Sequence, residues 1–282
     1  MISGTRKYYT IGEVSKICNI SAKALRYYDK IGVLSPDHIS EENGYRYYDR
    51  ETLLNVPVLK YYKQMGFKLE EMQELLSGNT YHFVRHSLHN KIDELKSQEQ
   101  EIHDSLIAVQ DWFELVREAQ LVVWNQVRDI SVKYIMESAY CYMEQEFQYD
   151  YMDSIINIPW TNYLEEHDEK ITGPVILSFD SFEKKKKGEA DTCRIMQAAV
   201  RINDKSPIQI REGAQMAASV YHIGNHETID QEYDRITEWA GLRGYTCSGM
   251  SYERYVVDYW TTRNSDEFVT EILVPLHSGI DE

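Results

Sequence analysis

The sequence predicts an α+β protein in three parts: an N-terminal winged helix-turn-helix, a long coiled-coil helix and a C-terminal antiparallel-sheet domain. Two short helical patterns before residue 31 are joined by a tight turn and followed by an Asn-Gly hairpin signal. Apolar residues then recur at every seventh position from 88 to 116, and alternating strand and helix patterns begin near residue 131. We place the parts at 1–78, 79–121 and 122–282, and a chain of 282 residues is long enough for more than one core.

The first two helices are predicted from their start signals. Thr10 and Glu13 match a capping box, in which the Thr10 side chain accepts from the Glu13 amide and the Glu13 carboxylate reaches back to Thr10. Asn19-Ile20 makes a turn, and Ser21 is a good N-cap for a second helix over residues 22–30. Two short helices joined in this way are typical of the helix-turn-helix, whose second helix enters the DNA major groove.

A hairpin and two further helices complete this first part. Asn43-Gly44 predicts a hairpin turn, and a hairpin that follows a helix-turn-helix forms a wing. Asp49 can cap a third helix running to Met65, with a kink expected at Pro57. A fourth helix is expected to stop at Gly78, and its apolar stripe is Leu69, Met72, Leu75 and Leu76.

About the first eighty residues closely resemble the DNA-binding domain of the MerR family of transcription regulators, because IGEV, ALRYYDKIG and YRYYD occur in that order. The resemblance implies a homodimer that binds double-stranded promoter DNA and acts on RNA polymerase through the promoter. By position it implies DNA contacts from Ser21, Lys23, Arg26, Tyr27 and Tyr28 on the recognition helix, Arg46 and Tyr47 on the first wing, and Lys63 and Lys68 at the second wing. Partial burial in the core is the alternative for Tyr27, Tyr45, Tyr47 and Tyr48, whereas DNA contact is strongly favoured for Arg26 and Arg46.

The charge distribution is compatible with DNA binding although the net charge is −16. Residues 1–80 hold 11 basic and 10 acidic side chains, whereas residues 131–282 hold 14 and 27, so the acidity lies mainly in the C-terminal half. Apolar runs of membrane-spanning length and a signal peptide are both absent from the sequence, so we expect a cytoplasmic protein without a membrane partner.

The cysteines give no sign of a metal or redox centre. Cys18, Cys141, Cys193 and Cys247 are scattered without C-x-x-C spacing, so we expect free, mostly buried thiols. Metal-sensing and redox-sensing MerR relatives carry cysteine clusters near the connector, and this chain has no cysteine between residues 19 and 140. We therefore expect no metal and no cofactor.

The connector carries an apolar heptad repeat. Residues 88, 95, 102, 109 and 116 are Leu, Leu, Ile, Val and Val, and residues 92, 99, 106 and 113 are Ile, Glu, Leu and Phe. This pattern, with one polar interruption, predicts a coiled coil, although packing against the rest of the chain is an alternative. The MerR resemblance implies an antiparallel coil that links two protomers.

The C-terminal part is predicted to hold two strand-helix-strand-strand halves. We expect strands near 132–143, 175–182, 192–202, 215–224, 250–260 and 268–275, and helices near 149–167 and 228–242. Residues 184–187 are four lysines, which we interpret as a solvated loop. Ser-Ala-Tyr-Cys at 138–141 and Ser-Val-Tyr-His at 219–222 each lead into a helix with a tryptophan, and two such halves would form a cleft along a pseudo-twofold axis.

This part is similar to the GyrI-like effector-binding domain, through VYHIG, the Trp239 helix and YERYVVDYW…EFVTEILVPL. Together with the first part, it resembles the multidrug-sensing BmrR-like branch of the MerR family. The period of a strand puts Glu253, Tyr255, Val257 and Tyr259 on one face, and a carboxylate among aromatic rings suits a lipophilic cation. By position, Glu253 corresponds to the drug-contacting acid, with Tyr221 and Phe268 as pocket aromatics; the internal repeat adds Tyr140 and Trp160.

Several alternatives stay open from the sequence. Two aromatic residues of that branch are replaced near Ile156 and Pro174, so we expect a different set of ligands. Glu253 could instead be an exposed carboxylate paired with a basic residue, and Tyr255 and Tyr259 could be core residues. The domain could also be a hydrolase with Glu253 or His222 as general base, or a protein-interaction module with an acidic face, although we predict that the protein is not an enzyme.

Overall fold

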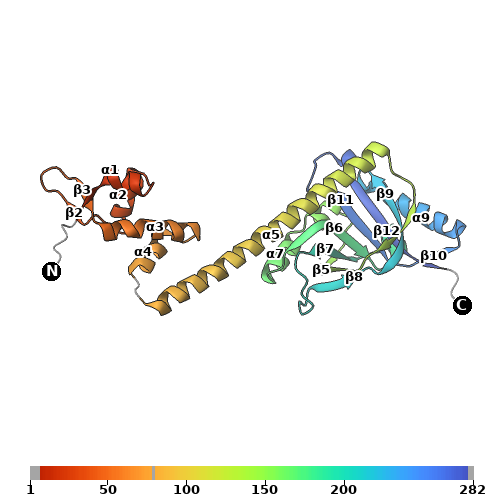
Figure 1. Cartoon of the computed structure of the whole chain (residues 1–282). Helices are drawn as coiled ribbons and strands as arrows, with labels where there is room; N and C mark the ends of the chain where they lie inside the picture. The colour runs from red at the N-terminus through yellow and green to blue at the C-terminus, as the bar shows by residue number, and fades with distance from the viewer. Residues whose placement is uncertain (1–6, 78–79, 279–282) are drawn as a thin grey trace. The chain divides into compact units, whose positions relative to one another are not determined.

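The computed structural model describes residues 7–77 and 80–278. The chain divides into two compact units, Met1–Gln100 and Glu101–Glu282. The boundary between them falls inside one long helix, α5 (Tyr81–Asn125), as Figure 1 shows. The predicted boundary at residues 78–79 and the helix stop at Gly78 lie outside the described residues.

The first unit starts with the predicted helix-turn-helix and wing. Helices α1 (Ile11–Ile17) and α2 (Ala22–Lys30) begin at the expected caps, because Thr10 accepts from the Glu13 amide and Ser21 from the Ala24 amide. Strands β1 (Tyr9–Thr10), β2 (His38–Ile39) and β3 (Arg46–Tyr48) form a small antiparallel sheet in the order β1-β3-β2. The capping box, the second helix and the wing hairpin are therefore confirmed.

Two more helices close the core of this unit. Helix α3 (Arg50–Gln64) is capped by Asp49 and contains Pro57, and α4 (Leu69–Ser77) follows a turn at Gly66, whose φ of 82° favours glycine. The buried core gathers residues from every helix and from the wing, including Val14, Leu25, Tyr48, Leu59, Met72 and Leu75.

Helix α5 exposes most of its predicted heptad positions. Among these, Ile102, Val109 and Phe113 have exposed fractions of 69%, 67% and 64%. A different side of the helix is buried against the second unit's own sheet, through Leu115, Ala119 and Val122. Leu88 packs against the core of the first unit, whereas the stripe from Leu95 to Phe113 remains largely exposed.

The second unit is built on one large antiparallel sheet with the strand order β4-β9-β12-β11-β6-β7-β5-β8, and β10 pairs with β12. Its strands are β4 (Ser131–Ile135), β5 (Ser138–Glu146), β6 (Ile171–Phe179), β7 (Thr192–Ala199), β8 (Gln209–Glu212), β9 (Gln215–Ile223), β10 (Tyr245–Cys247), β11 (Ser251–Val257) and β12 (Val269–Ser278). Strands β5, β6 and β7 with α6 and α7 form one strand-helix-strand-strand half, and β9, β11 and β12 with α9 form the other. The halves meet where β11 pairs with β6.

The helices of this unit are α6 (Tyr151–Ile155), α7 (Ile158–Glu166), α8 (Phe182–Lys186) and α9 (Asp230–Leu242), with 3-10 turns at His226–Thr228 and Ser265–Glu267. The predicted strand 132–143 is two strands, and the predicted helix 149–167 is two helices, because Asn157 starts a new one with its side chain. Strands β8 and β10 were not expected. The interpretation of residues 184–187 as a solvated loop is wrong, because they lie mainly in α8, which Ser181 caps.

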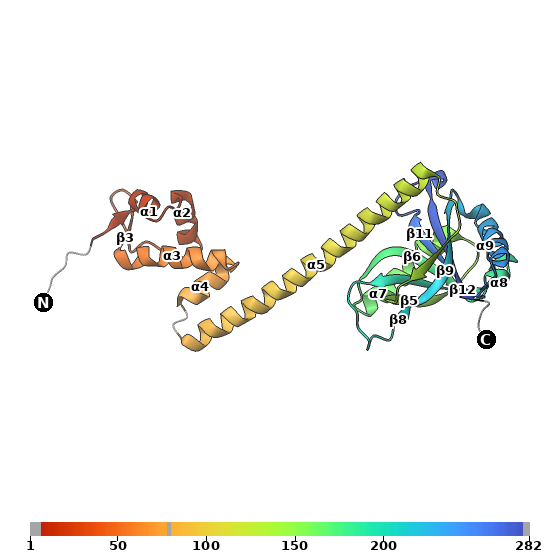
Figure 2. The same cartoon turned by 45° about the vertical axis from the view of Figure 1, so that its right-hand side comes forward.

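The register assigns the central residues to two faces. Paired residues share a face, so Arg254, Glu271, Tyr221, Ile176 and Met196 lie on one, which we call the α5 face. Glu253, Leu177, Ile195, Ile272 and Val220 lie on the other, which we call the α9 face. Figure 2 shows α8 and α9 on the side of the sheet away from α5.

A bulge between Tyr255 and Val257 breaks the alternation near the end of β11. Val257 therefore packs with α5 instead of lying beside Glu253 and Tyr255 as predicted, and Tyr259 lies beyond the strand. In the described ranges, none of the helices is both long and apolar enough to cross a membrane.

Candidate functional site

The recognition helix α2 presents a polar stripe. Lys23, Arg26, Tyr27 and Lys30 are spaced for one side of a helix and are exposed, and Ser21 is exposed at the N-cap. Leu25 is fully buried on the opposite side and fixes this orientation. Tyr28 is half-buried against the core, so its ring is only partly available.

The wing is fastened to the recognition helix. Arg46 Nε donates to Asp29 Oδ2 at 2.8 Å, which joins β3 to α2. This ion pair gives Arg46 a structural role that the sequence interpretation did not foresee. Tyr47 is half-buried and stacks on His38 with ring centroids 6.1 Å apart, while Tyr48 is fully buried and Tyr45 is exposed.

The turn between α1 and α2 is held by α3. Lys60 Nζ donates to the carbonyl oxygens of Cys18 and Asn19, the turn residue with φ of 47°. Lys63 and Lys68 are exposed around the α3–α4 turn, where the Lys68 amide donates to Glu71 at 2.6 Å. Both lysines are thus exposed at the turn where the second wing was predicted.

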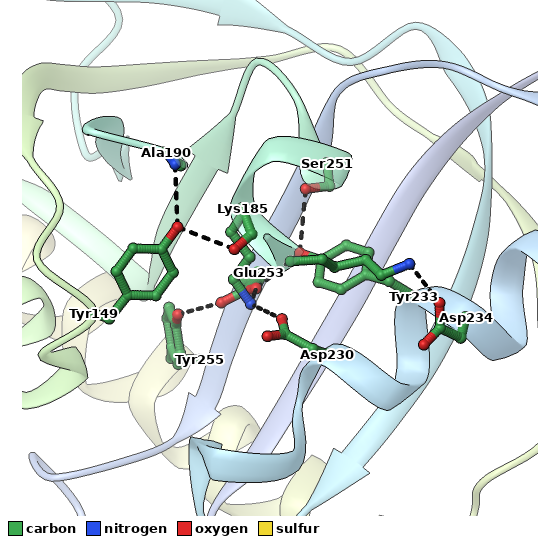
Figure 3. A network of polar contacts seen from close by, with 10 residues as sticks. Tyr149, Lys185, Ala190, Asp230, Tyr233, Asp234, Ser251, Glu253 and Tyr255 are labelled. Atoms are coloured by element: carbon green, nitrogen blue, oxygen red, sulfur yellow. Dashed lines mark hydrogen bonds and ion pairs between the residues drawn. The ribbon is translucent and has the colours of Figure 1, made fainter. Parts of the chain in front are cut away.

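In the second unit, Glu253 is fully buried on the α9 face at the junction of the two halves. It accepts from the Tyr233 hydroxyl at 2.7 Å and from the Tyr255 hydroxyl at 2.6 Å. Lys185 Nζ lies 2.9 Å from its Oε1 and also donates to Asp230 at 2.6 Å (Figure 3). The exposed carboxylate weighed as an alternative is excluded, but pairing with a basic residue is correct.

The electrostatics of this cluster keep both partners charged. Burial alone would raise the pKa of Glu253, yet Lys185 and the two tyrosine hydroxyls outweigh it and lower that pKa. Burial alone would lower the pKa of Lys185, yet Glu253 and Asp230 outweigh it and raise that pKa. Desolvation and then the Glu253 charge hold the pKa values of Tyr233 and Tyr255 well above the ordinary value, so both hydroxyls remain donors.

Aromatic rings surround the cluster on one side. The His226 ring lies 5.3 Å from both Tyr255 and Phe268, 6.0 Å from Tyr259 and 4.7 Å from Tyr151. Burial lowers the pKa of His226 to about 4, so this imidazole is neutral at pH 7. Tyr255, Phe268 and Tyr259 were predicted for this site, whereas His226 and Tyr151 were not.

A cavity of about 510 Å³ adjoins the cluster, lined by residues of α5, α7, β6, β11 and the segment after β11. Its walls include Trp112, Trp160, Trp260, Tyr255 and Asp258. Tyr255 is shared by the cavity and the Glu253 cluster, because it lines the cavity while its hydroxyl donates to Glu253. The size and the aromatic walls suit a lipophilic molecule.

Asp258 is the most buried carboxylate of that wall besides Asp104. Its Oδ1 accepts from the Trp260 amide at 2.8 Å, and burial raises the pKa of Asp258 to about 6. Asp104 is ion-paired with Lys170 and Arg201. Of the two predicted departures from the drug-sensing pattern, Pro174 lines the cavity, whereas Ile156 is the C-cap of α6.

Two predicted pocket residues lie elsewhere. Tyr221 shares the α5 face with Arg254, and Tyr140, which lies two residues before Tyr142 on β5, packs with Tyr252 on that face. The Tyr221 hydroxyl donates to Glu118 of α5 at 2.9 Å. Each half of the internal repeat puts its tyrosine on the α5 face, whereas Glu253 lies on the α9 face. The sheet therefore separates both Tyr221 and Tyr140 from Glu253.

The α5 face carries a second polar network. Arg254 donates to both Glu118 carboxylate oxygens at 2.6 and 2.7 Å and to Glu271 at 3.1 Å. Glu271 is buried and also accepts from Ser219 at 2.5 Å and from Lys133. Through adjacent residues of β11, the Glu253 cluster on one face is thus joined to α5 on the other.

Sequence reasoning missed Lys185, Tyr233 and Asp230, which complete the cluster. The available signal was Ser181, which can cap a short helix, followed by Phe182 and Lys185 at a spacing that puts both on one side. Without this cap, a run of four lysines predicts an exposed loop; with it, the run predicts a short helix with one buried side. For Tyr233 the periodicity of α9 with Ile236 and Ala240 indicates burial but not a polar partner.

The cysteines are free thiols, as expected. Cys141 and Cys193 are buried, and burial raises the pKa of each to about 12, so neither is a thiolate at neutral pH. Within the residues that the structure covers, no group of three or more candidate ligands is arranged to hold a metal ion.

Comparisons with known proteins agree with both units. The chain matches the MerR HTH family of regulatory proteins over residues 9–79 and the GyrI-like small molecule binding domain over residues 129–277. The multidrug-efflux transporter 2 regulator of Bacillus subtilis is 25% identical over 284 residues, which cover 97% of this chain and 98% of that protein. The multidrug-efflux transporter 1 regulator of the same organism is 41% identical over 101 residues, or 34% of this chain and 36% of that one.

A solved structure of an EcmrR–DNA complex in EcmrR-RPo covers 96% of this chain and 100% of its own, with 24% identity and a TM-score of 0.45. Because that TM-score is below 0.5, the assignment rests on the family matches. The GyrI-like match alone spans just over half of the 282 residues. The chain therefore belongs to the proteins with a GyrI-like small molecule binding domain, and it carries a MerR-type helix-turn-helix domain at residues 9–79.

Proposed function

We propose that this chain binds promoter DNA as a homodimer, distorts the promoter spacer and thereby sets the output of RNA polymerase in response to a lipophilic small molecule. The observation that carries the proposal is the joining, in one chain, of a MerR-type recognition helix and a GyrI-like domain with an aromatic cavity. Because its target is DNA, we place the protein in the cytoplasm.

The DNA contacts follow from the exposed side of α2. Lys23, Arg26 and Tyr27 point away from the core and would meet base edges and phosphates, with Ser21 at the helix N-terminus. Tyr28 is half-buried and would contribute through its exposed edge. Arg46 would act mainly by bracing the wing on Asp29, and Tyr47, Lys63 and Lys68 would contact the backbone.

The dimer follows from the exposed heptad of α5. Ile102, Val109 and Phe113 are apolar, largely exposed and aligned on one stripe. A stripe of this kind is stabilised by a second helix that covers it. A second copy of this chain supplies the same stripe, and an antiparallel arrangement would hold two recognition modules apart.

The ligand would lie in the cavity beside Trp160 and Tyr255, with Phe268 and Tyr259 in the aromatic layer behind it. Stacking on flat rings demands less geometry than hydrogen bonding, so a range of lipophilic shapes fits. Tyr221 and Tyr140 would act on the other face of the sheet, where Tyr221 binds Glu118 of α5. A ligand that displaces Tyr255 would move β11, and Arg254 would pass the change to α5.

Selection of duplex DNA from a random pool by the full-length protein tests the DNA half of this proposal. We expect an inverted-repeat site, because a twofold dimer reads two equal half-sites. Arg26→Ala should lose at least about tenfold in affinity for the selected site. Lys96→Ala removes the same charge from an exposed position of α5 and should lose less than about twofold. A parent protein that selects no sequence, or a Lys96→Ala loss equal to that of Arg26→Ala, would contradict sequence-specific reading by α2.

The hydrolase alternative has little support from the geometry of its proposed bases. Both oxygens of Glu253 accept hydrogen bonds inside a fully buried cluster, and its lowered pKa makes it a weak base. His222 Nε2 lies 2.7 Å from the Asn225 carbonyl oxygen. For the interaction-module alternative, the support is the net acidity of this half of the chain.

A further inference from the structure

Lys185 is a lysine inside a core. It lies on α8, has no exposed surface and is held by Glu253 Oε1 at 2.9 Å and Asp230 Oδ1 at 2.6 Å. Its ammonium also lies over three rings, 5.0 Å from the centroid of Tyr233, 5.6 Å from Tyr151 and 5.8 Å from Phe179. Lysine is rarely buried to this degree unless it is fully paired.

The carboxylate and the aromatic rings around Lys185 are the groups that bind a lipophilic cation favourably. Such a ligand gains from a desolvated carboxylate and from aromatic faces within about 6 Å of its charge. At Glu253 the chain's own ammonium already makes both kinds of contact. A second cation placed there would find a carboxylate that is already neutralised, and displacing Lys185 would leave a buried ammonium without its carboxylate.

The neighbouring cavity is a different place. It is lined by Trp112, Trp160, Trp260 and Asp258, and Tyr255 is the member of the Glu253 cluster that also lines it. A molecule can therefore stack in the cavity while the Lys185–Glu253 pair stays closed behind the Tyr255 ring.

We propose that Lys185 is a built-in occupant of the Glu253 cation site, and that ligands of this chain bind in the tryptophan-lined cavity without an ion pair to Glu253. This inference rests on the proposed binding of a lipophilic molecule by the second unit. It makes Lys185 a specificity-determining residue, because its ammonium decides whether Glu253 can stabilise a positive charge on the ligand.

The test uses the full-length protein and two matched fluorescent probes. Diphenylhexatriene is uncharged, and its trimethylammonium derivative adds a permanent positive charge to the same apolar rod. The ratio of the two dissociation constants isolates the contribution of charge from that of shape. Lys185→Met removes the ammonium and keeps the length of the side chain. Lys186→Met, on the same helix and paired with Asp234, is the matched control.

Lys185→Met should raise the preference for the charged probe about tenfold, because Glu253 loses its internal partner. Lys186→Met should leave the ratio within about twofold of the parent value. An unchanged ratio in folded Lys185→Met would overturn the proposal.

A second variant decides the question even if Lys185→Met does not fold. Lys185→Met with Glu253→Gln removes both charges together, an exchange that buried ion pairs often tolerate. Its ratio should equal that of the parent protein, because neither protein then offers Glu253 to the ligand. A drop of about tenfold below the parent would show that Glu253 binds the ligand directly and would overturn the proposal. If the parent protein binds neither probe, the proposed ligand-binding function itself fails.

Discussion

Asp258 shows how one residue can set the chemistry of the cavity. Its carboxylate lies among Trp260, Tyr255 and Val256, and the chain provides the Trp260 amide as a hydrogen-bond donor. Burial raises the pKa of Asp258, and the hydrogen bond from the Trp260 amide offsets only part of this rise. At Glu253, by contrast, a lysine outweighs the effect of burial. A carboxylate kept in such surroundings costs folding free energy at neutral pH, and it is a natural partner for any positive charge on a ligand.

Asp258→Asn should therefore stabilise the protein at neutral pH. Burial raises the pKa of Asp258 from 3.8 to about 6, so the folded state holds the proton more tightly and loses stability as pH rises through that interval. Asparagine keeps the acceptor for the Trp260 amide but never ionises. We expect a gain of about 3 kcal/mol in the free energy of unfolding at pH 7.5, which shrinks toward zero below pH 4.

Urea unfolding between pH 4 and 8, followed by tryptophan fluorescence, measures this difference. Asp266→Asn is the control, because that carboxylate is exposed and its removal should change stability by less than about 0.5 kcal/mol at any pH. A stability difference for Asp258→Asn that does not depend on pH would contradict the assignment of a raised pKa.

At the scale of elements, α5 is fastened to its own sheet by carboxylates spaced seven residues apart. Asp104 binds Lys170 and Arg201, Asp111 accepts from Thr172 at 2.6 Å, and Glu118 accepts from Arg254 and Tyr221. These positions come two residues after heptad positions 102, 109 and 116. Two residues turn a helix by about 200°, so the carboxylates lie roughly opposite the apolar stripe.

Arg254→Met tests whether β11 and α5 are coupled through this fastening. The substitution removes the bidentate ion pair with Glu118 and leaves the Glu253 cluster, on the other face of the sheet, unchanged. We expect diphenylhexatriene affinity to change less than about twofold and stability to fall by about 1–3 kcal/mol. The ligand-dependent change in transcription from the selected promoter should fall at least threefold.

Arg117→Met is the matched control, since Arg117 directly precedes Glu118 on α5 and pairs with Glu114 at an exposed position. It should leave the ligand response intact. If Arg254→Met responds to ligand as the parent does, coupling must pass through another part of the sheet.

What the sequence predicts well in these elements is local. Thr10, Ser21 and Asp49 cap their helices as expected, because a cap depends only on the next three residues. The period of two failed at Val257, because a bulge depends on the partner strand. The Glu253–Lys185 pair was beyond sequence reasoning, because it needs α8 and β11 to meet in the fold.

For the whole molecule, the proposed dimer places its main apolar contact on a helix shared by both units. Ile102 and Val109 are exposed and belong to the same stripe as Leu106 and Phe113. Covering this stripe would bury the apolar surface that the chain's own cores leave out. The fold class itself was predictable from the sequence, since the two halves of the sheet and the helix-turn-helix each have a local signature.

Ile102→Glu should convert the dimer to a monomer. A carboxylate in the middle of an apolar helix interface would be buried without a partner, which weakens association at least a hundredfold. Sedimentation velocity at micromolar concentration measures the change, and DNA affinity should fall with it. Gln110→Glu adds the same charge beside the stripe and should remain a dimer. Dimeric Ile102→Glu would indicate that protomers meet elsewhere.

The shared seven-residue spacing of Asp104, Asp111 and Glu118 with the apolar stripe limits how the length of α5 can change in evolution or in design. One residue inserted between Asp111 and Glu118 would rotate everything after it by about 100°, and would misalign the sheet fastening and the stripe together. An insertion of a whole heptad before Asp104 keeps the stripe and the three carboxylates aligned and lengthens the helix by about 10 Å. The length of α5 before Asp104 is thus adjustable only in steps of a heptad.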